Sequence, residues 1–398
     1  MKKIFAFAEA YSLPLLLGIG IALFWANLAP DSYHHFVEFS LFGNVTIHFL
    51  VKEVFMALFF GVAMAEIVEA LRPGGALHPL PKAVNPLLAT AGGVLGPVLV
   101  FFLLLWVFDG FDYANGWGIV TATDIAIAWL GAKLIFGADH PGVKYLLLLA
   151  VADDAVGLVI IGIFYPAATV ELSYLALCIL GMIIAYVLRS MHTVHHGFYL
   201  LLAGIPCWLG LYLAHLEPAL ALVLVVPFLP SVHRKELMVS AGAVPADTAH
   251  FALESFYCSW KPVVDYGLFF FGLVNAGVLL SSVAPVTWYI VAALLVGKTV
   301  GISLFGLLGG KLGFPLPQGM TGRDLFLVSI VAGVGLTVSL FMCDAAFAGE
   351  DALGAAKMGA LLSISAVPLG YLISRSIVKT KKIKEEKRRC RRWILQIL

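Results

Sequence analysis

Residues 145–165 read YLLLLAVADDAVGLVIIGIFY, an apolar run with two adjacent aspartates near its middle. About 20 helical residues, each rising ~1.5 Å, cover the ~30 Å hydrocarbon core of a bilayer, so this run is long enough to cross one. On insertion scales one carboxylate at the bilayer centre costs roughly 2.5–3.5 kcal/mol, so Asp153 and Asp154 together cost roughly 5–7 kcal/mol if they face lipid. Such a pair marks an ion or proton pathway by default.

The composition of the whole chain is that of a membrane protein. Of its 398 residues, 61% are hydrophobic and 12% charged, and the mean hydropathy is +0.97. Repeated apolar stretches predict an all-α polytopic bundle, because the alternation of a transmembrane β-barrel is missing. The net charge of +1 alone says nothing about partners, and we expect no nucleic-acid partner. We expect neither disulfides nor a metal site from the five irregularly spaced cysteines, which are Cys178, Cys207, Cys258, Cys343 and Cys390.

We predict twelve transmembrane spans, at 11–28, 53–71, 84–108, 117–136, 143–165, 172–190, 197–214, 217–230, 262–281, 286–308, 322–345 and 352–375. The first predicted span could instead be a signal peptide, but its apolar run is longer than that of a typical signal peptide. With both termini cytoplasmic, 22 of the 25 Lys and Arg lie inside, since only Lys52 and Lys357 fall outside and Lys298 lies within a span. The positive-inside rule therefore predicts cytoplasmic termini.

Two segments outside the spans carry further predictions. Residues 36–49, FVEFSLFGNVTIHF, alternate apolar and polar residues around Gly43-Asn44, which predicts an external β-hairpin, with an irregular loop as the alternative. Residues 379–392, KTKKIKEEKRRCRR, lie in a basic cytoplasmic tail, 376–398, that we expect to contact anionic lipids.

Few other ionisable residues are predicted inside a span. Asp124 lies in GIVTATDIAIAWL (118–130), where Thr121 and Thr123 weaken the helix and offer oxygen atoms. Lys298 lies in AALLVGKTVGISLFG (292–306), and Glu66 lies late in the second span, where it could also be an interfacial residue. A purely structural ion-pair network is the alternative to a transport role for these charges.

The positions of these charges suggest a division of roles. Adjacent helix residues point about 100° apart, so Asp153 and Asp154 cannot face one partner. We expect one of them to pair with Lys298 and the other to converge with Asp124 on a cation. Two carboxylates with hydroxyl and free carbonyl oxygens suit a small hard cation such as Na⁺ or Li⁺. The same carboxylates can hold protons when the cation is absent, which predicts cation–proton exchange.

Two spans contain helix-weakening stretches at corresponding places. Span four carries TATD (121–124) and span eleven carries GVGLT (333–337). Paired interruptions of this kind indicate inverted repeats around a midplane site, here at about 84–165 and 286–375 within one transporter domain, 1–375. The partial charges at the broken helix ends need compensation, which Asp124 and Lys298 are placed to supply.

Four motifs, in this order, closely resemble the NhaA family of bacterial Na⁺/H⁺ antiporters: TDIAIA (123–128), AVADDAVGLVIIGIFY (150–165), GKTVGISLFG (297–306) and GVGLTVSLF (333–341). That family is itself an established example of the inverted-repeat architecture. The resemblance runs from about 11 to 372. It implies twelve helices with two unwound crossing segments, electrogenic exchange of protons for Na⁺ or Li⁺ and no cofactor. It also implies a bacterial inner-membrane location and a homodimer that forms through the hairpin.

The resemblance also implies roles for single residues. Asp154 matches the essential cation- and proton-binding carboxylate, and Asp124 with Thr123 matches its partner on the unwound chain. Asp153 matches the residue that pairs with Lys298, which compensates charge and is a candidate proton carrier.

Three positions depart from the family pattern and concern pH regulation or local packing. After Glu66 the family's Lys-Arg-Glu cluster is replaced by Ile67–Ala70, and Glu217 stands where the family has a histidine. Asp265 is an acid that the family pattern does not predict. Glu66, Glu217 and His215 are the candidates for any pH response.

Three other functions were weighed. An intramembrane aspartyl protease needs Tyr-Asp and Gly-x-Gly-Asp motifs, whereas here Asp265-Tyr266 is reversed and Gly333-Val334-Gly335 precedes Leu336. A zinc enzyme lacks an acid beside its candidate ligands, which are His192, His195 and His196. A passive cation channel stays open as an alternative, because only a transport assay separates it from an antiporter.

Overall fold

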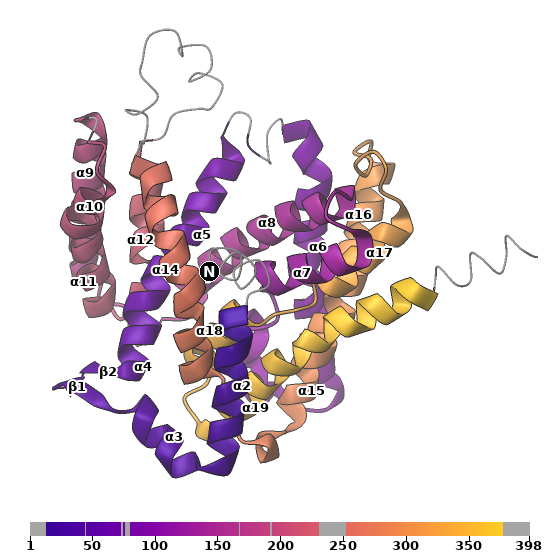
Figure 1. Cartoon of the computed structure of the whole chain (residues 1–398), viewed down its shortest axis with the longest axis horizontal. Helices are drawn as coiled ribbons and strands as arrows, with labels where there is room; N and C mark the ends of the chain where they lie inside the picture. Colours follow the sequence, from indigo (N-terminus) through magenta and orange to yellow (C-terminus); the bar gives the residue numbers. More distant parts are fainter. Residues whose placement is uncertain are drawn as a thin grey trace, which may run out of the picture.

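The computed structural model describes residues 13–43, 45–72, 75, 80–166, 168–191, 193–230 and 252–376, which are almost entirely helical (Figure 1). The elements of the first half are α2 (Leu13–Leu28), α3 (Pro30–Val37), β1 (Ser40–Phe42), β2 (Val45–Thr46), α4 (Ile47–Phe49), the π-helix η1 (Leu50–Phe55), α5 (Met56–Leu71), α6 (Leu80–Val107), the 3₁₀-helix η2 (Phe111–Gly118), α7 (Ile125–Phe136), α8 (Pro141–Phe164), the 3₁₀-helix η3 (Leu172–Tyr174) and α9 (Leu175–Ser190).

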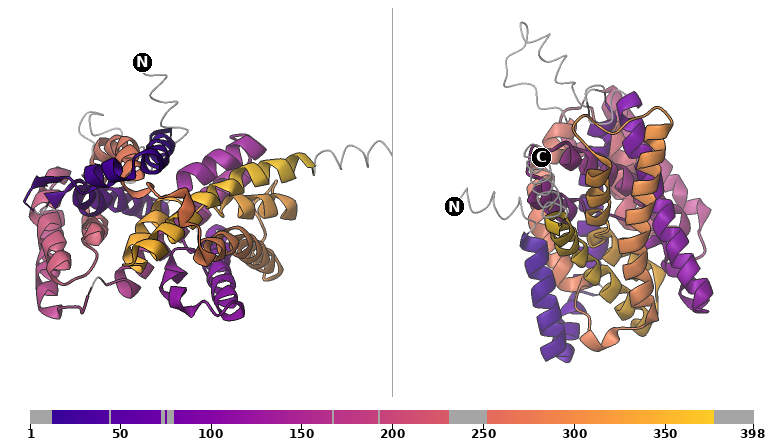
Figure 2. Two further views of the ribbon diagram at one scale, coloured as in Figure 1. Left: turned by 90° about the horizontal axis from the view of Figure 1, so that it is seen from below. Right: turned by 90° about the vertical axis from the view of Figure 1, so that its right-hand side faces the viewer.

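The second half continues with α10 (His196–Phe198), the π-helix η4 (Tyr199–Gly204), α11 (Ile205–Leu213), the 3₁₀-helix η5 (Pro218–Leu220), α12 (Ala221–Val225), the 3₁₀-helix η6 (Val226–Phe228), α14 (Ala252–Asn275), the 3₁₀-helix η8 (Leu280–Ser282), α15 (Pro285–Ala292), the π-helix η9 (Ala293–Gly297), α16 (Lys298–Lys311), α17 (Gly322–Val331), α18 (Thr337–Ala346), α19 (Glu350–Leu362) and the 3₁₀-helix η10 (Ser363–Ser365). The helix of α19 and η10 runs on to Ser376. The two views in Figure 2 show α2 lying along α14.

Within these ranges, seven continuous helices are long and apolar enough to cross a membrane: Ile47–Leu71, Ala83–Val107, Pro141–Phe164, Leu172–Ser190, His196–Leu213, Pro285–Lys311 and Glu350–Ser376. Four shorter apolar helices coincide with predicted spans one, four, eight and eleven: Leu13–Leu28, Ile125–Phe136, Pro218–Phe228 and Thr337–Ala346. The all-α polytopic class is confirmed. The count of twelve spans and the inverted repeat stay predictions, and the basic tail beyond 376 lies outside the described residues.

Two predicted spans differ from the helices found. Span nine was placed at 262–281, but α14 runs from Ala252 to Asn275 and contains Pro262. The predicted span starts after the charged Lys261, whereas the helix begins earlier in the chain and its first turns are polar. Span eight, at 217–230, consists of three short helical pieces between Pro218 and Phe228. Eleven residues of helix rise only ~17 Å, about half of a bilayer core.

A short antiparallel strand pair is present where the hairpin was predicted. Strand β1 pairs with β2, with Ser40 opposite Thr46, and the pair protrudes from the helices at the lower left of Figure 1. It is much shorter than the predicted 36–49, because α3 continues to Val37 and α4 begins at Ile47. Thr46 caps α4 by accepting a hydrogen bond from the Phe49 N–H at 3.1 Å. The external location of the pair stays a prediction.

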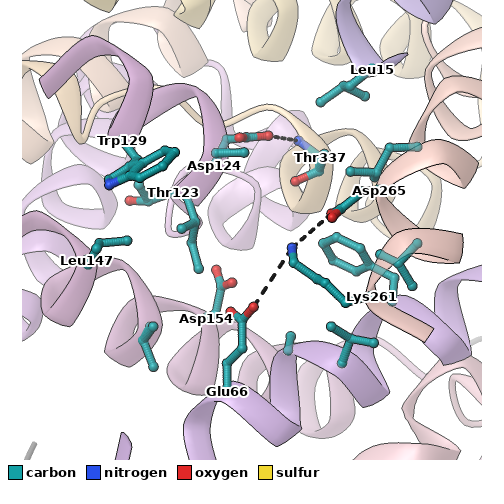
Figure 3. Close-up of a pocket in the computed structure, with 18 of the residues that line it drawn as sticks. Leu15, Glu66, Thr123, Asp124, Trp129, Leu147, Asp154, Lys261, Asp265 and Thr337 are labelled. Atoms are coloured by element: carbon teal, nitrogen blue, oxygen red, sulfur yellow. Dashed lines mark hydrogen bonds and ion pairs between the residues drawn. The ribbon is translucent and has the colours of Figure 1, made fainter. Parts of the chain in front are cut away.

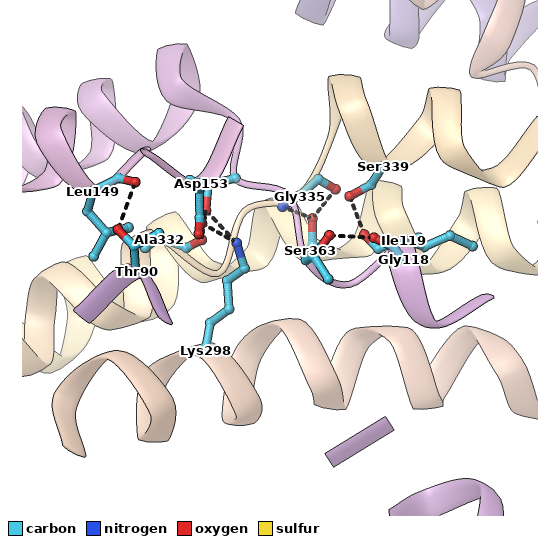
Figure 4. Close-up of polar contacts among 12 residues, drawn as sticks. Thr90, Gly118, Ile119, Leu149, Asp153, Lys298, Ala332, Gly335, Ser339 and Ser363 are labelled. Carbon is cyan, nitrogen blue, oxygen red and sulfur yellow. Dashed lines mark hydrogen bonds and ion pairs between the residues drawn. The ribbon is translucent and has the colours of Figure 1, made fainter. Parts of the chain in front are cut away.

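The two interrupted spans meet at their breaks. Residues 122–124 between η2 and α7 and residues 334–336 between α17 and α18 are non-helical. The breaks are joined directly, since the Asp124 N–H donates to the Val334 carbonyl at 2.7 Å. In the same region the Ser339 hydroxyl donates to the Ile119 carbonyl at 2.7 Å, and the Gly335 N–H donates to Ser363 at 3.0 Å (Figure 4). These bonds satisfy backbone groups that a lipid environment would leave unpaired.

Helices α6 and α16 approach each other closely through glycines, and this contact positions Lys298. A Cβ added at Gly92 would lie 2.2 Å from the Gly301 carbonyl oxygen, and one added at Gly96 would lie 2.4 Å from that of Gly297. Only glycine permits this separation, as at many helix crossings in membranes. Gly297 and Gly301 flank Lys298, whose side chain is therefore held in the protein interior.

Candidate functional site

Asp124 joins the first turns of two half-helices. It caps the N-terminus of α7, where its Oδ1 accepts a hydrogen bond from the Ile127 N–H at 3.0 Å. Its Oδ2 accepts one from the Thr337 N–H at 3.3 Å, at the start of α18 (Figure 3). The positive ends of both helix dipoles thus meet one carboxylate.

Lys298 and Asp153 form a fully buried ion pair. The Lys298 ammonium lies 2.8 Å from Asp153 Oδ2, and neither side chain is exposed to solvent. The Thr123 hydroxyl completes the group, because it accepts from Lys298 at 2.5 Å and donates to Asp153 at 2.6 Å. Figure 4 shows the Lys298 side chain reaching from α16 to Asp153 on α8. Thr123 is therefore engaged with the ion pair, and its expected place beside the cation stays a prediction.

Asp154 faces a cavity instead. The cavity has a volume of about 820 Å³ and is lined by Asp124, Asp154, Thr123 and Thr337 together with parts of α2, α5 and α14. Asp154 is only 8% exposed, and its buried Oδ1 has no hydrogen-bond partner within the described residues. Of the two adjacent aspartates, then, one is neutralised by lysine and the other presents a carboxylate to a space that a small ion can enter.

A second charged group lines the same cavity, and in it Glu66 and Asp265, both singled out in the sequence, approach Lys261. Lys261 lies 2.8 Å from Asp265 and 3.9 Å from Glu66 (Figure 3). The Tyr257 hydroxyl also donates a hydrogen bond to Glu66 at 3.0 Å. Lys261 and Asp265 are four residues apart on α14, which is the spacing of a helical ion pair. A helix starting at Ala252 would have revealed this pair in the sequence, but span nine was predicted to start after Lys261.

The remaining candidates do not line this cavity. Glu217 precedes η5 and is 6% exposed, with its Oε1 unpartnered in the described part of the chain. His215 is exposed, has a positive φ of 59° and lies 3.9 Å from Glu171. Among the candidates for a pH response, only Glu66 shares the cavity with the aspartates. His192 lies outside the described residues, so the His192, His195 and His196 cluster cannot be placed as a whole.

The arrangement can bind one small cation or protons. Within the described ranges, no three or more His, Cys, Asp or Glu side chains come together as a metal site. A cation between Asp124 and Asp154 would therefore complete its shell with hydroxyl, carbonyl and water oxygens, as hard monovalent ions do. Weak, incomplete coordination suits an ion that must be released again.

Comparison with known proteins gives consistent matches over almost the whole chain. Residues 2–373 match the family model described as Na⁺/H⁺ antiporter 1. A Geobacter sulfurreducens protein named Na⁺/H⁺ antiporter NhaA is 50% identical over 379 residues, which cover 95% of this chain and 98% of that protein. A protein of the same name from Geotalea uraniireducens is 51% identical over 377 residues, covering 94% and 97%.

A solved structure supports the fold. The sodium proton antiporter MjNhaP1 from Methanocaldococcus jannaschii superposes with a TM-score of 0.53 over 92% of this chain and 91% of that one. The sequence identity is 14%, so this likeness concerns the fold alone.

Proposed function

The chain belongs to the Na⁺/H⁺ antiporter 1 family, and we propose that it exchanges Na⁺ for H⁺ with Asp124 and Asp154 as the groups that bind both ions. It is a multi-pass membrane protein, given its apolar helices and its relatives. We further propose that it is a secondary active transporter of the bacterial inner membrane, with cytoplasmic termini, and that it exports Na⁺.

One observation carries the assignment of the site. The Asp154 carboxylate lies almost fully buried at the wall of the cavity with an unpartnered oxygen, beside an aspartate that two helix N-termini hold in place. Buried charges without partners are unfavourable, so such a group is expected to bind either a proton or a cation. The same group cannot hold both at once, and this mutual exclusion couples the two ions.

Charge balance supports electrogenic exchange. Two carboxylates, Asp124 and Asp154, can take up two protons when the cation leaves and one Na⁺ or Li⁺ when the protons leave. Each cycle of this kind moves one net charge across the membrane. The non-helical crossing at residues 122–124 and 334–336 can shift without breaking a continuous helix, which suits alternating access to the two sides.

Two further proposals concern the assembly of the protein and its contacts with lipids. The strand pair β1–β2 leaves unpaired edges that a second copy of the chain can extend, so we propose a homodimer. The basic tail is proposed to contact anionic lipids from its composition alone.

The function is tested by counterflow in proteoliposomes. A Na⁺ gradient should drive proton movement in the opposite direction, with Li⁺ as a second substrate, K⁺ as the comparison and pH as the variable. A passive channel would carry Na⁺ with no coupled proton movement. Neither a channel nor an aspartyl protease is favoured by relatives that are named antiporters.

A further inference from the structure

Another group of charges, which are partly buried, lies at the other end of the helices from the cavity. This outer cluster consists of Lys52, Glu53, Glu217, Asp344 and Lys357. Lys357 lies 2.7 Å from Asp344, and Lys52 lies 3.8 Å from Glu53. Lys52 also interacts electrostatically with Glu217 and Asp344, so the five residues form one charged group. Its lysines are the two that the positive-inside rule places on the external side.

Helix α18 connects the outer cluster to the aspartate site. The N-terminal residue of α18, Thr337, donates to Asp124, and Asp344 lies in the last turn of the same helix. Seven residues of helix separate these positions by ~10 Å. The outer cluster and the aspartate site therefore contact opposite ends of the same short helix.

The charges of the outer cluster do not balance. Three carboxylates face two ammonium groups, which leaves one negative charge unmatched. Glu217 is 6% exposed, and its buried Oε1 has no hydrogen-bond partner among the described residues. Glu53 Oε2 and Asp344 Oδ2 are buried and unpartnered as well. A buried carboxylate without a partner is expected to bind either a cation or a proton.

The backbone at Glu53, within the outer cluster, is irregular. Glu53 lies in the π-helix η1, a type of distortion that is frequent at functional sites. The extra residue in the turn exposes the Glu53 carbonyl, which accepts a hydrogen bond from the Trp208 indole at 3.1 Å.

We propose that the outer cluster is a second cation site, which binds one Na⁺ on the external side between Glu217 and Asp344. This proposal rests on the proposed function only for the direction of travel, in which Na⁺ passes from the aspartate pair to the outside. Within the described residues no three or more His, Cys, Asp or Glu side chains form a group that could hold a metal ion, so two carboxylates and water would hold the proposed Na⁺. Loose binding suits a hydrated monovalent ion in transit.

His48 also interacts with Asp344, Lys357 and Lys52, so binding is to be measured above pH 8, where an ordinary imidazole is neutral.

The test is radioactive ²²Na⁺ binding to the purified full chain, in a background where the aspartate site is disabled by Asp124→Asn and Asp154→Asn. This background should keep a weak, saturable Na⁺ site. Adding Glu217→Gln should weaken the remaining binding by about fivefold or more, because one of the unmatched charges is removed. Glu217→Asp should retain most of it. The matched control is Glu350→Gln at the exposed start of α19, which should change binding by less than about twofold.

Two outcomes would overturn the proposal: no Na⁺ binding in the disabled background, or equal binding in the Glu217→Gln and Glu350→Gln proteins. The second would mean that Glu217 holds a proton instead, and infrared spectroscopy would then show a protonated carboxyl band that Glu217→Gln removes. If the multiple variants do not fold, the single variant Glu217→Gln is tested in liposomes. It should raise the KM for Na⁺ added at the outer face more than the KM for Na⁺ added at the inner face. Equal changes in the two KM values would contradict the proposal. Failure of the proposed function is distinct, because it appears as absent Na⁺-driven proton movement in the wild-type protein.

Discussion

The Lys298 ammonium lies 2.8 Å from Asp153 Oδ2 in complete isolation from solvent, while the next residue along α8, Asp154, faces the cavity. A single step along the helix, a rotation of about 100°, thus separates a neutralised charge from an available one. The Thr123 hydroxyl ties the pair to the interrupted chain before α7, so the ion pair and the break support each other.

Removing Lys298 should destabilise the protein strongly. Lys298→Ala leaves Asp153 charged and buried, which typically costs about 3–5 kcal/mol in the free energy of unfolding. The double variant Asp153→Asn with Lys298→Gln should recover part of this loss, as measured by thermal melting in detergent. Lys311→Ala, at the exposed end of the same helix, is the control and should change stability by less than about 0.5 kcal/mol. A double variant as unstable as the sum of both single variants would show that the residues are not energetic partners.

The sequence predicted the charges of the site better than their contacts. Asp124, Asp154 and Lys298 could be singled out because an ionisable group inside an apolar run is unfavourable unless it has a role. The hydrogen bonds of Thr123 to Lys298 and Asp153 could not, because they join segments far apart in the sequence. Their geometry depends on how three helices pack.

The strand pair should control assembly without affecting transport. Two strands of this length are marginal alone, so a second copy of the chain is expected to extend them. Replacing Ser40–Thr46 with a flexible linker should produce monomers that still exchange Na⁺ for H⁺. The replacement leaves His48 and Lys52 in place, so it does not alter the outer cluster. An unchanged particle mass in detergent would refute the contact.

Lys261 should weaken Na⁺ entry from the cavity side. Its ammonium lines the cavity near Glu66 and Asp265, and a fixed positive charge repels an approaching cation. Lys261→Gln should lower the KM for Na⁺ on that side by roughly two- to fivefold, as measured in sided vesicles. Lys311→Gln removes an exposed charge elsewhere and should have little effect. A KM that is unchanged or raised in Lys261→Gln would argue against this role.

The extent of α14 explains why the contact between Lys261 and Asp265 was not predicted. Span nine was predicted to start just after Lys261, whereas α14 begins ten residues earlier at Ala252. Polar helical turns are stabilised by their neighbours in the bundle, and single-sequence hydropathy does not detect that stabilisation.

Activity should fall at acid pH because protons and Na⁺ compete. Na⁺ binds the ionised carboxylates of Asp124 and Asp154, so the KM for Na⁺ should rise as pH falls, by up to about tenfold per pH unit for each competing proton. The maximal rate at saturating Na⁺ should change much less, and the midpoint of the pH profile should move with Na⁺ concentration. Steep activation at a pH that does not depend on Na⁺ would instead require a separate sensor, for which His215 is the next residue to test.

The central claim is that Asp154 is the carboxylate that binds Na⁺ and H⁺ in turn. The most direct test is Na⁺-driven proton movement in proteoliposomes that contain Asp154→Asn, with the protein shown to be folded by thermal melting. The account predicts no exchange above that of empty liposomes, while Asp124→Asn retains exchange with weakened Na⁺ affinity or turnover. Exchange by Asp154→Asn at the wild-type rate would contradict it.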